Sequence, residues 1–257
     1  MGISEILSGV YAIAMTCSTL NLASSYDLMA QGLLVVGTLL LSTVRKKRSF
    51  LPYLNTKHTV IPCAVVGVVD IVSSTQISNS LDLYTNFTFK RSFLKAASQR
   101  AKESNIMILN DTGDGFLFLA NDENSSNWCM NLASFYENLT SDFQDILRHT
   151  NDLTGQQLQS GLRFGVSCGP VILGGLGDKS SQITAVGSIV NLAARLCSRA
   201  DVNEIVFSAR VWETLRTVLP DWKVEKRIYG DLKGFNSDVS VLHANRRAIT
   251  LQLGTAA

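Results

Sequence analysis

IPCAVVGVVD, residues 61–70, is the stretch that most restricts the fold of this chain of 257 residues. Its almost continuous run of apolar side chains predicts a central β-strand covered on both faces, because a half-exposed strand would alternate apolar and polar residues. The strand ends on a carboxylate, Asp70. Ser73, Ser74 and Thr75 follow as candidates for the N-cap of a helix. The sequence therefore predicts a buried strand that carries an acidic side chain at its end.

The residues after this strand predict a mixed α/β (α+β) fold, because short apolar runs alternate with longer segments of helical period. Residues 106–109 and 115–120 are predicted strands, and the tight turn between them places Asp114 at the tip of a hairpin. The other predicted helices lie near 79–103, 127–149 and 188–198, and the other predicted strands near 163–168, 182–185, 204–207, 223–229 and 239–243.

The composition changes near residue 48. Residues 6–26 carry no charged side chain, and residues 28–44 are nearly all apolar and are followed directly by the basic cluster 45–48. This pattern predicts a helical hairpin in residues 1–48 that anchors the chain to the inner membrane through residues 6–44, with the rest in the cytoplasm. A linker at 49–58 and one domain at 59–257 complete the expected organisation. A cytoplasmic protein in which the hydrophobic helices pair two subunits is the alternative.

Charge and cysteine content exclude several classes of protein. The 23 basic and 21 acidic residues give a net charge of +2, too small to indicate nucleic-acid binding. The five cysteines are odd in number and form no CxxC pair, so neither a disulfide framework nor a thiolate zinc site is predicted. We expect reduced, mostly buried thiols, as in a cytosolic protein.

The two carboxylates at Asp70 and Asp114 suit Mg²⁺, which prefers hard oxygen ligands and is commonly held by few protein groups, with nucleotide phosphates completing its shell. Aspartates at strand ends and turns are also common structural residues, so the pair alone does not decide the function.

Four stretches add to the pair, in this order: VVGVVDIVSST at 65–75, NDTGDGFLF at 110–118, RFGVSCGPV at 163–171 and ITAVGSIVNLAARL at 183–196. Together they resemble class III nucleotide cyclases, the family of adenylate and guanylate cyclases, over residues 59–243. The resemblance implies a ferredoxin-like βααββαβ core and a head-to-tail homodimer whose active sites use both subunits. It also implies a lyase that converts a nucleoside triphosphate to a 3′,5′-cyclic nucleotide, a second messenger, and pyrophosphate.

The metal and phosphate residues follow from the same resemblance. Asp70, Asp114 and the backbone carbonyl of Ile71 correspond to the ligands of two Mg²⁺ or Mn²⁺ ions per active site. The backbone amides of residues 71–75, which include Ser73, Ser74 and Thr75, would bind phosphate at a helix start, where N–H groups favour anions.

The second subunit would supply the remaining groups. Asn191 corresponds to the asparagine that orients the ribose, and Arg195 to the arginine that stabilises charge on the reacting phosphate. The two are four residues apart and therefore share one helical face. Lys233, in the word LKGF, corresponds to a lysine that holds the terminal phosphates, with a solvated turn residue as the alternative.

The residues expected to read the base depart from the family's purine pattern. Asn110 stands where purine-selective members carry a lysine, and Thr184 where most carry an aspartate, although threonine also occurs in a subclass of bacterial adenylate cyclases. Asparagine both donates and accepts hydrogen bonds, whereas lysine only donates. These changes resemble the pyrimidine cyclases of bacterial antiphage defence and predict UTP or CTP as the substrate. An adenylate cyclase making cyclic AMP, with Asn110 as a turn-capping residue, is the alternative.

Other functional classes fit less well. GGLGDKS at 174–180 lacks the glycine directly before the lysine that a P-loop needs, and no GG(D/E)EF word of a diguanylate cyclase is present. A catalytically inactive, cyclase-like regulatory module remains an alternative, against which the retention of all four catalytic residue types argues. His58, His149 and His243 are predicted to be ordinary surface or edge residues.

Overall fold

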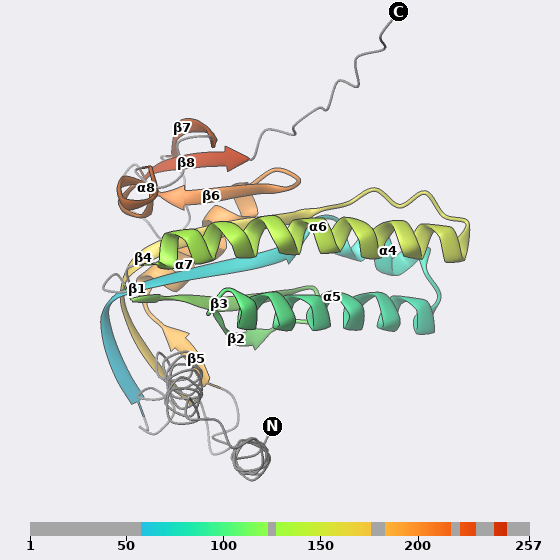
Figure 1. Ribbon diagram of the computed structural model, residues 1–257, viewed down its shortest axis with the longest axis horizontal. Helices are drawn as coiled ribbons and strands as arrows, with labels where there is room; N and C mark the ends of the chain where they lie inside the picture. Colours follow the sequence, from blue (N-terminus) through green and yellow to red (C-terminus); the bar gives the residue numbers. More distant parts are fainter. Residues whose placement is uncertain (1–57, 123–126, 176–182, 217–221, 230–238, 246–257) are drawn as a thin grey trace, which may run out of the picture. The chain divides into compact units, whose positions relative to one another are not determined.

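The computed structural model describes residues 58–122, 127–175, 183–216, 222–229 and 239–245 (Figure 1). The predicted hydrophobic hairpin, the basic cluster and most of the predicted linker lie outside the described residues, as does Lys233. Within the described ranges, no helix combines the length and apolar character that crossing a membrane requires.

The described part of the chain contains one eight-stranded sheet and five helices. In chain order the elements are β1 (His58–Ile71), α4 (Ser74–Ser80), α5 (Leu83–Glu103), β2 (Met107–Asp111), β3 (Gly115–Asp122), α6 (Trp128–Thr154), β4 (Leu162–Gly175), β5 (Ile183–Val186), α7 (Ser188–Arg199), β6 (Glu204–Ser208), α8 (Ala209–Leu215), β7 (Lys223–Tyr229) and β8 (Val239–Asn245). The first seven elements follow the predicted order βααββαβ.

The strand order across the sheet is β2-β3-β1-β4-β6-β8-β7, with β5 paired to β4 outside this path. The valine-rich β1 lies between β3 and β4 and is antiparallel to both, which confirms the predicted central strand. Its register places Asp70 opposite Gly115 on one side and opposite Arg163 on the other. The end of β1 is therefore flanked by the hairpin of β2 and β3 and by the start of β4.

The single helix predicted over 79–103 is in fact two helices, α4 and α5. The chain leaves α4 at Leu81, which has an extended backbone, and α5 begins after Asp82. Asp82 Oδ1 accepts hydrogen bonds from the backbone amides of Tyr84 at 2.9 Å and Thr85 at 3.1 Å. This N-cap stabilises a new helix start inside a segment whose helical period is continuous, so periodicity alone could not reveal the break.

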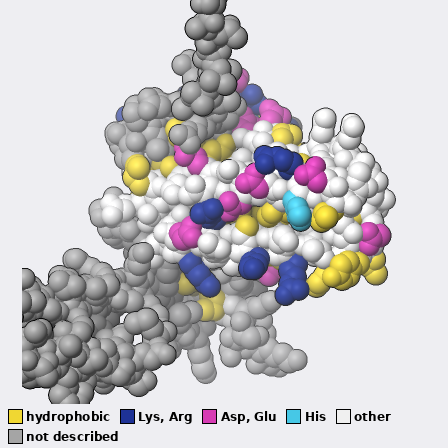
Figure 2. All heavy atoms as spheres, turned by 45° about the vertical axis from the view of Figure 1, so that its right-hand side comes forward, with side chains coloured by type: hydrophobic (Ala, Val, Ile, Leu, Met, Phe, Trp, Pro, Cys, Tyr) yellow, Lys and Arg dark blue, Asp and Glu magenta, His cyan; other side chains and the backbone are white. Residues whose placement is uncertain are grey.

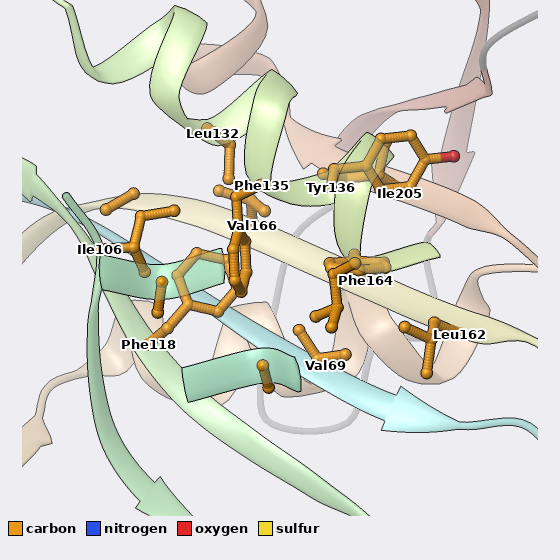
Figure 3. Close-up of a cluster of buried hydrophobic side chains, with 14 of the residues drawn as sticks. Val69, Ile106, Phe118, Leu132, Phe135, Tyr136, Leu162, Phe164, Val166 and Ile205 are labelled. Atoms are coloured by element: carbon orange, nitrogen blue, oxygen red, sulfur yellow. The ribbon is translucent and has the colours of Figure 1, made fainter. Parts of the chain in front are cut away.

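One face of the sheet is covered by α5 and α6, which pack against each other (Figure 1). Between the helices and the strands lies a cluster of buried aromatic rings, part of which Figure 3 shows. Phe93 and Phe143 meet edge to face with centroids 5.7 Å apart, and Phe118 and Phe135 do so at 5.4 Å. The Arg100 guanidinium of α5 pairs with Asp142 of α6 beside this core.

Helix α7 covers the opposite face of the sheet. Side chains alternate along a strand, and Phe164 and Val166 of β4 belong to the aromatic cluster, so Gly165 between them faces the other way. A Cβ atom on Gly165 would lie 2.1 Å from the backbone nitrogen of Cys197 and 2.2 Å from the carbonyl oxygen of Ala193. The glycine therefore lets the backbone of α7 lie directly on β4.

Candidate active site

Asp70 lies at the end of β1 on the face that α7 covers, and 28% of its side chain is exposed. The Arg163 guanidinium, from the neighbouring position on β4, donates to Asp70 Oδ2 through Nε at 2.9 Å and through a second nitrogen. Both bonds reach the same carboxylate oxygen, so the ion pair orients Asp70 and neither bond occupies Oδ1. A partly exposed, charged carboxylate is the state that a hard metal ion requires.

Asp114 is tied to the same end of the sheet by two hydrogen bonds, and a third bond lies within its own turn. Its carbonyl oxygen accepts from the amide of Ile71 at 2.9 Å, and its Oδ2 accepts from the Ser74 hydroxyl at 2.8 Å. The Thr112 hydroxyl donates to Oδ1 at 3.3 Å. The hairpin tip is therefore fastened to the residues that follow Asp70, which brings the two predicted metal ligands together.

Two glycines make this turn fit. Gly113 has a φ of +86°, in the left-handed region that other residues rarely adopt. A Cβ atom on Gly115 would lie 2.3 Å from the carbonyl oxygen of Val69, so any side chain there would push the hairpin away from β1.

The donor set fits magnesium or manganese held jointly with a nucleotide. Nowhere in the described ranges do three or more His, Cys, Asp or Glu side chains gather as a metal cluster. Mg²⁺ is commonly held by one or two carboxylates while substrate phosphates complete its octahedral shell, so two aspartates beside an open site match this mode.

Fewer backbone amides are available to bind phosphate in the structure than the sequence predicted. The amide of Ile71 donates to Asp114 and the amide of Val72 donates to the carbonyl oxygen of Gly161, each at 2.9 Å, so neither can bind phosphate. Ser73, which precedes α4, has the left-handed φ of 57°. The amides of Ser73, Ser74 and Thr75 stay candidates, and the Ser74 hydroxyl has the separate task of holding Asp114.

A cavity of about 240 Å³ lies between the β1–β3 region and α7. Its polar walls include Asp70, Arg163 and Asn110, and its apolar walls include Val68 and Val190. The Asn110 side chain is exposed and makes no hydrogen bond to any residue that the structure describes.

The cysteines of the described residues agree with the prediction of reduced, mostly buried thiols: Cys129, Cys168 and Cys197 are buried and Cys63 is half-buried. Cys197 lines the cavity beneath Asp70. Burial, together with the nearby Asp70 charge, raises the pKa of the Cys197 thiol to about 12. The thiol therefore lines the cavity as a neutral group and does not act as a nucleophile.

Asn191 and Arg195 lie one turn apart on α7 and are both exposed. Neither lines the cavity that contains Asp70, whereas their neighbours Val190 and Ala194 do. Within one protomer, the structure thus gathers Asp70 and Asp114 at one place and leaves Asn191 and Arg195 on the outer side of α7. Thr184 is half-buried on β5, which contacts β2, the strand of Asn110.

Comparisons with known proteins identify the family. The model of the adenylate and guanylate cyclase catalytic domain matches residues 61–243. The chain belongs to this family. It is therefore a class III nucleotide cyclase, and the predicted family and fold are confirmed. A separate search among curated proteins finds no match.

Solved cyclase structures share the fold of this cyclase. The adenylyl cyclase CyaB from P. aeruginosa has a TM-score of 0.64 at 20% identity, covering 76% of this chain and 100% of that chain. The guanylyl cyclase Cya2 gives 0.65 at 19% identity, covering 78% and 100%. The guanylate cyclase domain of RhGC from Catenaria anguillulae in complex with GTP gives 0.58 at 18% identity, covering 74% and 100%.

Sequence reasoning missed the role of Arg163 in this cyclase. Arg163 is the first residue of one of the family stretches. Its partner, Asp70, follows only from the register of β1 against β4, which the local sequence does not encode.

The prediction for His243 is wrong. His58 and His149 are exposed as expected, but His243 is 2% exposed and its Nδ1 lies 2.8 Å from Glu204 Oε2. The carboxylate can only accept, so Nδ1 donates to it, and the Tyr229 hydroxyl lies 3.1 Å from Nε2. The ring is buried because β6, β7 and β8 pair around it, which is a tertiary effect.

Proposed function

We propose that this cyclase acts as a homodimer in which Asp70 and Asp114 of one subunit face Asn191 and Arg195 of the other. The observation that carries the proposal is the separation within one protomer. Asp70 lines a cavity and Asp114 is hydrogen-bonded to the residues that follow Asp70, whereas Asn191 and Arg195 are exposed on α7 and do not line that cavity. Two subunits related by a two-fold axis would complete two equal sites.

The residues present define a mechanism for the cyclisation. Asp70, Asp114 and the carbonyl of Ile71 would hold two Mg²⁺ or Mn²⁺ ions, which favour loss of the proton from the ribose 3′-hydroxyl and neutralise phosphate charge. The bond from O3′ to the α-phosphorus forms as the bond to pyrophosphate breaks. None of the described histidines lines the cavity, so alignment and charge stabilisation do the work, as in other phosphoryl transfers.

The individual side chains divide this work. Arg163 orients Asp70 and adds a positive charge beside the entering triphosphate. The amides of Ser73 to Thr75 would bind phosphate oxygens. Asn191 would hold the ribose so that O3′ faces the α-phosphorus, and Arg195 would stabilise the negative charge that develops there. Lys233 would hold the terminal phosphates.

Complementation between two inactive variants tests the shared site. Asp70→Asn and Arg195→Ala should each be inactive alone, but an equal mixture should regain about a quarter of the wild-type rate, because half the dimers then carry one intact site. A mixture of Asp70→Asn with Asp114→Asn is the matched control and should stay inactive. Failure to recover activity despite demonstrated subunit exchange would refute the two-subunit site.

For the base, we propose UTP or CTP over ATP. The support is Asn110, which is exposed at the cavity wall with its amide unoccupied by the described residues, at the position expected to read the base. An unpaired ring group in a closed pocket costs about 1–3 kcal/mol, enough to change which nucleotide is preferred.

Turnover of an equimolar mixture of ATP, GTP, CTP and UTP with Mn²⁺, followed by chromatography of the products, decides the base. Exclusive formation of cyclic AMP would refute the pyrimidine proposal. Asn110→Lys should shift turnover toward purines, whereas Asn138→Lys, on the surface of α6, should not change the product ratio.

The proposed biological role is antiviral: the cyclic pyrimidine nucleotide would be an alarm signal in antiphage defence. Protection of a bacterial host from phage by the wild type, and its loss with Asp70→Asn, is the expected result. Equal protection by both proteins would separate any defence role from catalysis.

We also propose that residues 6–44 associate the cyclase with the membrane, with the basic cluster 45–48 on the cytoplasmic side. The chain should then leave the membrane fraction only in detergent. Extraction by alkaline carbonate alone would favour the alternative in which the hydrophobic helices pair two subunits.

A further inference from the structure

The N-terminal half of α5 exposes unusually large apolar side chains. Leu83 is 87% exposed, Tyr84 79% and Phe87 62%. In Figure 2 a patch of hydrophobic side chains lies at the lower right of the described part, where α5 begins. Residues of this size stay in water at a free-energy cost, and a contiguous group of them commonly marks a contact surface.

Basic side chains continue this patch along α5. Lys90, Arg91 and Lys95 follow Leu83 and Phe87 at helical spacing and line the same shallow groove. Figure 2 shows dark-blue side chains in a row beside the hydrophobic patch. We define the α5 stripe as the three exposed apolar residues and the three cations together: Leu83, Tyr84, Phe87, Lys90, Arg91 and Lys95.

The cations of the α5 stripe lack the ion pairs that neighbouring arginines form with described residues. Arg100, further along α5, pairs with Asp142 and Glu103, and Arg148 pairs with Asp145. Lys90, Arg91 and Lys95 form no ion pair with any residue in the described ranges. No acidic residue occurs in α5 before its last residue, Glu103. The stripe therefore presents uncompensated positive charge next to exposed apolar surface.

An anionic lipid surface matches both the apolar part and the basic part of the stripe. Aromatic and aliphatic side chains enter the headgroup region, while lysine and arginine contact acidic headgroups. The chain itself carries 17 nearly all apolar residues at 28–44 followed by four basic residues, so its own sequence predicts a bilayer nearby. Nucleic acid is a poorer match, because three cations and a net charge of +2 give little phosphate neutralisation.

We propose that the α5 stripe docks the catalytic domain on an anionic membrane surface, with Leu83, Tyr84 and Phe87 in the headgroup region and the three cations against acidic headgroups. This inference rests on the proposed membrane association for the presence of a bilayer, and extends it from the terminal segment to the folded domain.

Tryptophan reporters in the full-length chain test the contact. Phe87→Trp reports the stripe, and Ile228→Trp reports an equally exposed position, 61%, on β7 at the other edge of the sheet. Each variant is reconstituted in vesicles of phosphatidylcholine with brominated chains, with or without phosphatidylglycerol. We expect the bromines to quench Phe87→Trp but not Ile228→Trp, only when phosphatidylglycerol is present, and less as salt is raised.

Charge reversal tests the electrostatic half. Lys90→Glu, Arg91→Glu and Lys95→Glu together should abolish quenching of the Phe87→Trp reporter. The matched control replaces Arg210, Arg216 and Lys226 with glutamate. Arg210 lies on α8, Arg216 directly follows α8, and Lys226 lies on β7. This control changes the net charge equally, but the Phe87→Trp reporter should still be quenched. Unaltered thermal unfolding of both triple variants shows that the fold is intact.

The outcomes separate this inference from the membrane anchor. Flotation of the chain with vesicles reports residues 6–44, whereas quenching reports the stripe. A chain that floats without preferential quenching of Phe87→Trp overturns the docking proposal and leaves the anchor; a chain that neither floats nor is quenched removes both. If the stripe reversal instead lowers the oligomeric state without lipid, the stripe is a protein interface and the proposal fails.

Discussion

The two faces of the central sheet are built from different side chains. On the α5 and α6 side, fully buried phenylalanine rings meet edge to face in the pairs Phe93 with Phe143 and Phe118 with Phe135. On the α7 side, Gly165 and Cys197 pack closely, and the partly exposed Asp70 and Arg163 border a cavity. One sheet thus separates the residues that stabilise the domain from those proposed to perform the chemistry.

The alternation of side chains along single strands produces this separation. Val69 joins the aromatic cluster while Asp70 faces α7, and Phe164 joins the cluster while Arg163 pairs with Asp70. Each strand carries both functions at successive positions. Substitutions on one face should therefore affect mainly activity, and substitutions on the other mainly stability.

The largest effect is expected from Asp70→Asn. Loss of one carboxylate ligand should lower cyclic nucleotide formation with Mn²⁺ by about 10³-fold or more, because metal binding and charge stabilisation both suffer. Asp111→Asn, which changes an exposed carboxylate on the hairpin of β2 and β3, is the matched control and should stay active. Undiminished turnover would remove Asp70 from the mechanism.

On the aromatic face, Phe143→Ala should lower the free energy of unfolding by about 3–5 kcal/mol, because the ring is buried against Phe89 and Phe93. Turnover per folded molecule should not change. Leu153→Ala, at a position 71% exposed, should change the unfolding free energy by less than about 0.5 kcal/mol. A selective loss of turnover in Phe143→Ala would contradict the division between the faces.

Glycine-to-alanine substitutions can add a methyl group to each face of the sheet, at Gly165 on the α7 side and at Gly67 on the aromatic side. Gly165→Ala meets the backbone of α7, whereas the Cβ of Gly67→Ala would meet only the Phe118 ring. Both should cost about 1–3 kcal/mol of stability. Only Gly165→Ala should also reduce turnover, by about tenfold, because it displaces the helix of Asn191 and Arg195. Equal turnover per folded molecule in the two variants would contradict this expectation.

The smallest effect concerns Glu204. Burial raises its pKa, but hydrogen bonds from His243 and from the Asp201 amide outweigh burial and hold the pKa below its ordinary value of 4.5. Its stabilising contribution is therefore present above that value and is lost as pH falls through the lowered pKa. Urea unfolding of wild type and Glu204→Gln should differ by about 1 kcal/mol at neutral pH and converge in acid. A difference independent of pH would exclude Glu204 as its source.

Local patterns sufficed for the elements whose burial is continuous or strictly periodic. The valines of 61–70 predicted the central strand, and the turn at 111–114 predicted the hairpin that carries Asp114. The division between α4 and α5 was not predicted, because the N-cap at Asp82 interrupts an otherwise regular helical pattern. The buried pair of His243 and Glu204 was missed because its residues are 39 positions apart.

By itself, the sequence determined the two aspartates at a strand end and a turn, and it determined the family through four short motifs. The order βααββαβ followed from that resemblance, whereas the helical period alone predicted one helix over 79–103. Only the tertiary structure decided that Arg163 holds Asp70, that Ile71 and Val72 donate their amides within the protein, and that Asn191 and Arg195 stay outside the cavity. Strand register and helix docking set these relations. Both depend on packing between segments that are distant along the chain, and no local pattern encodes that packing.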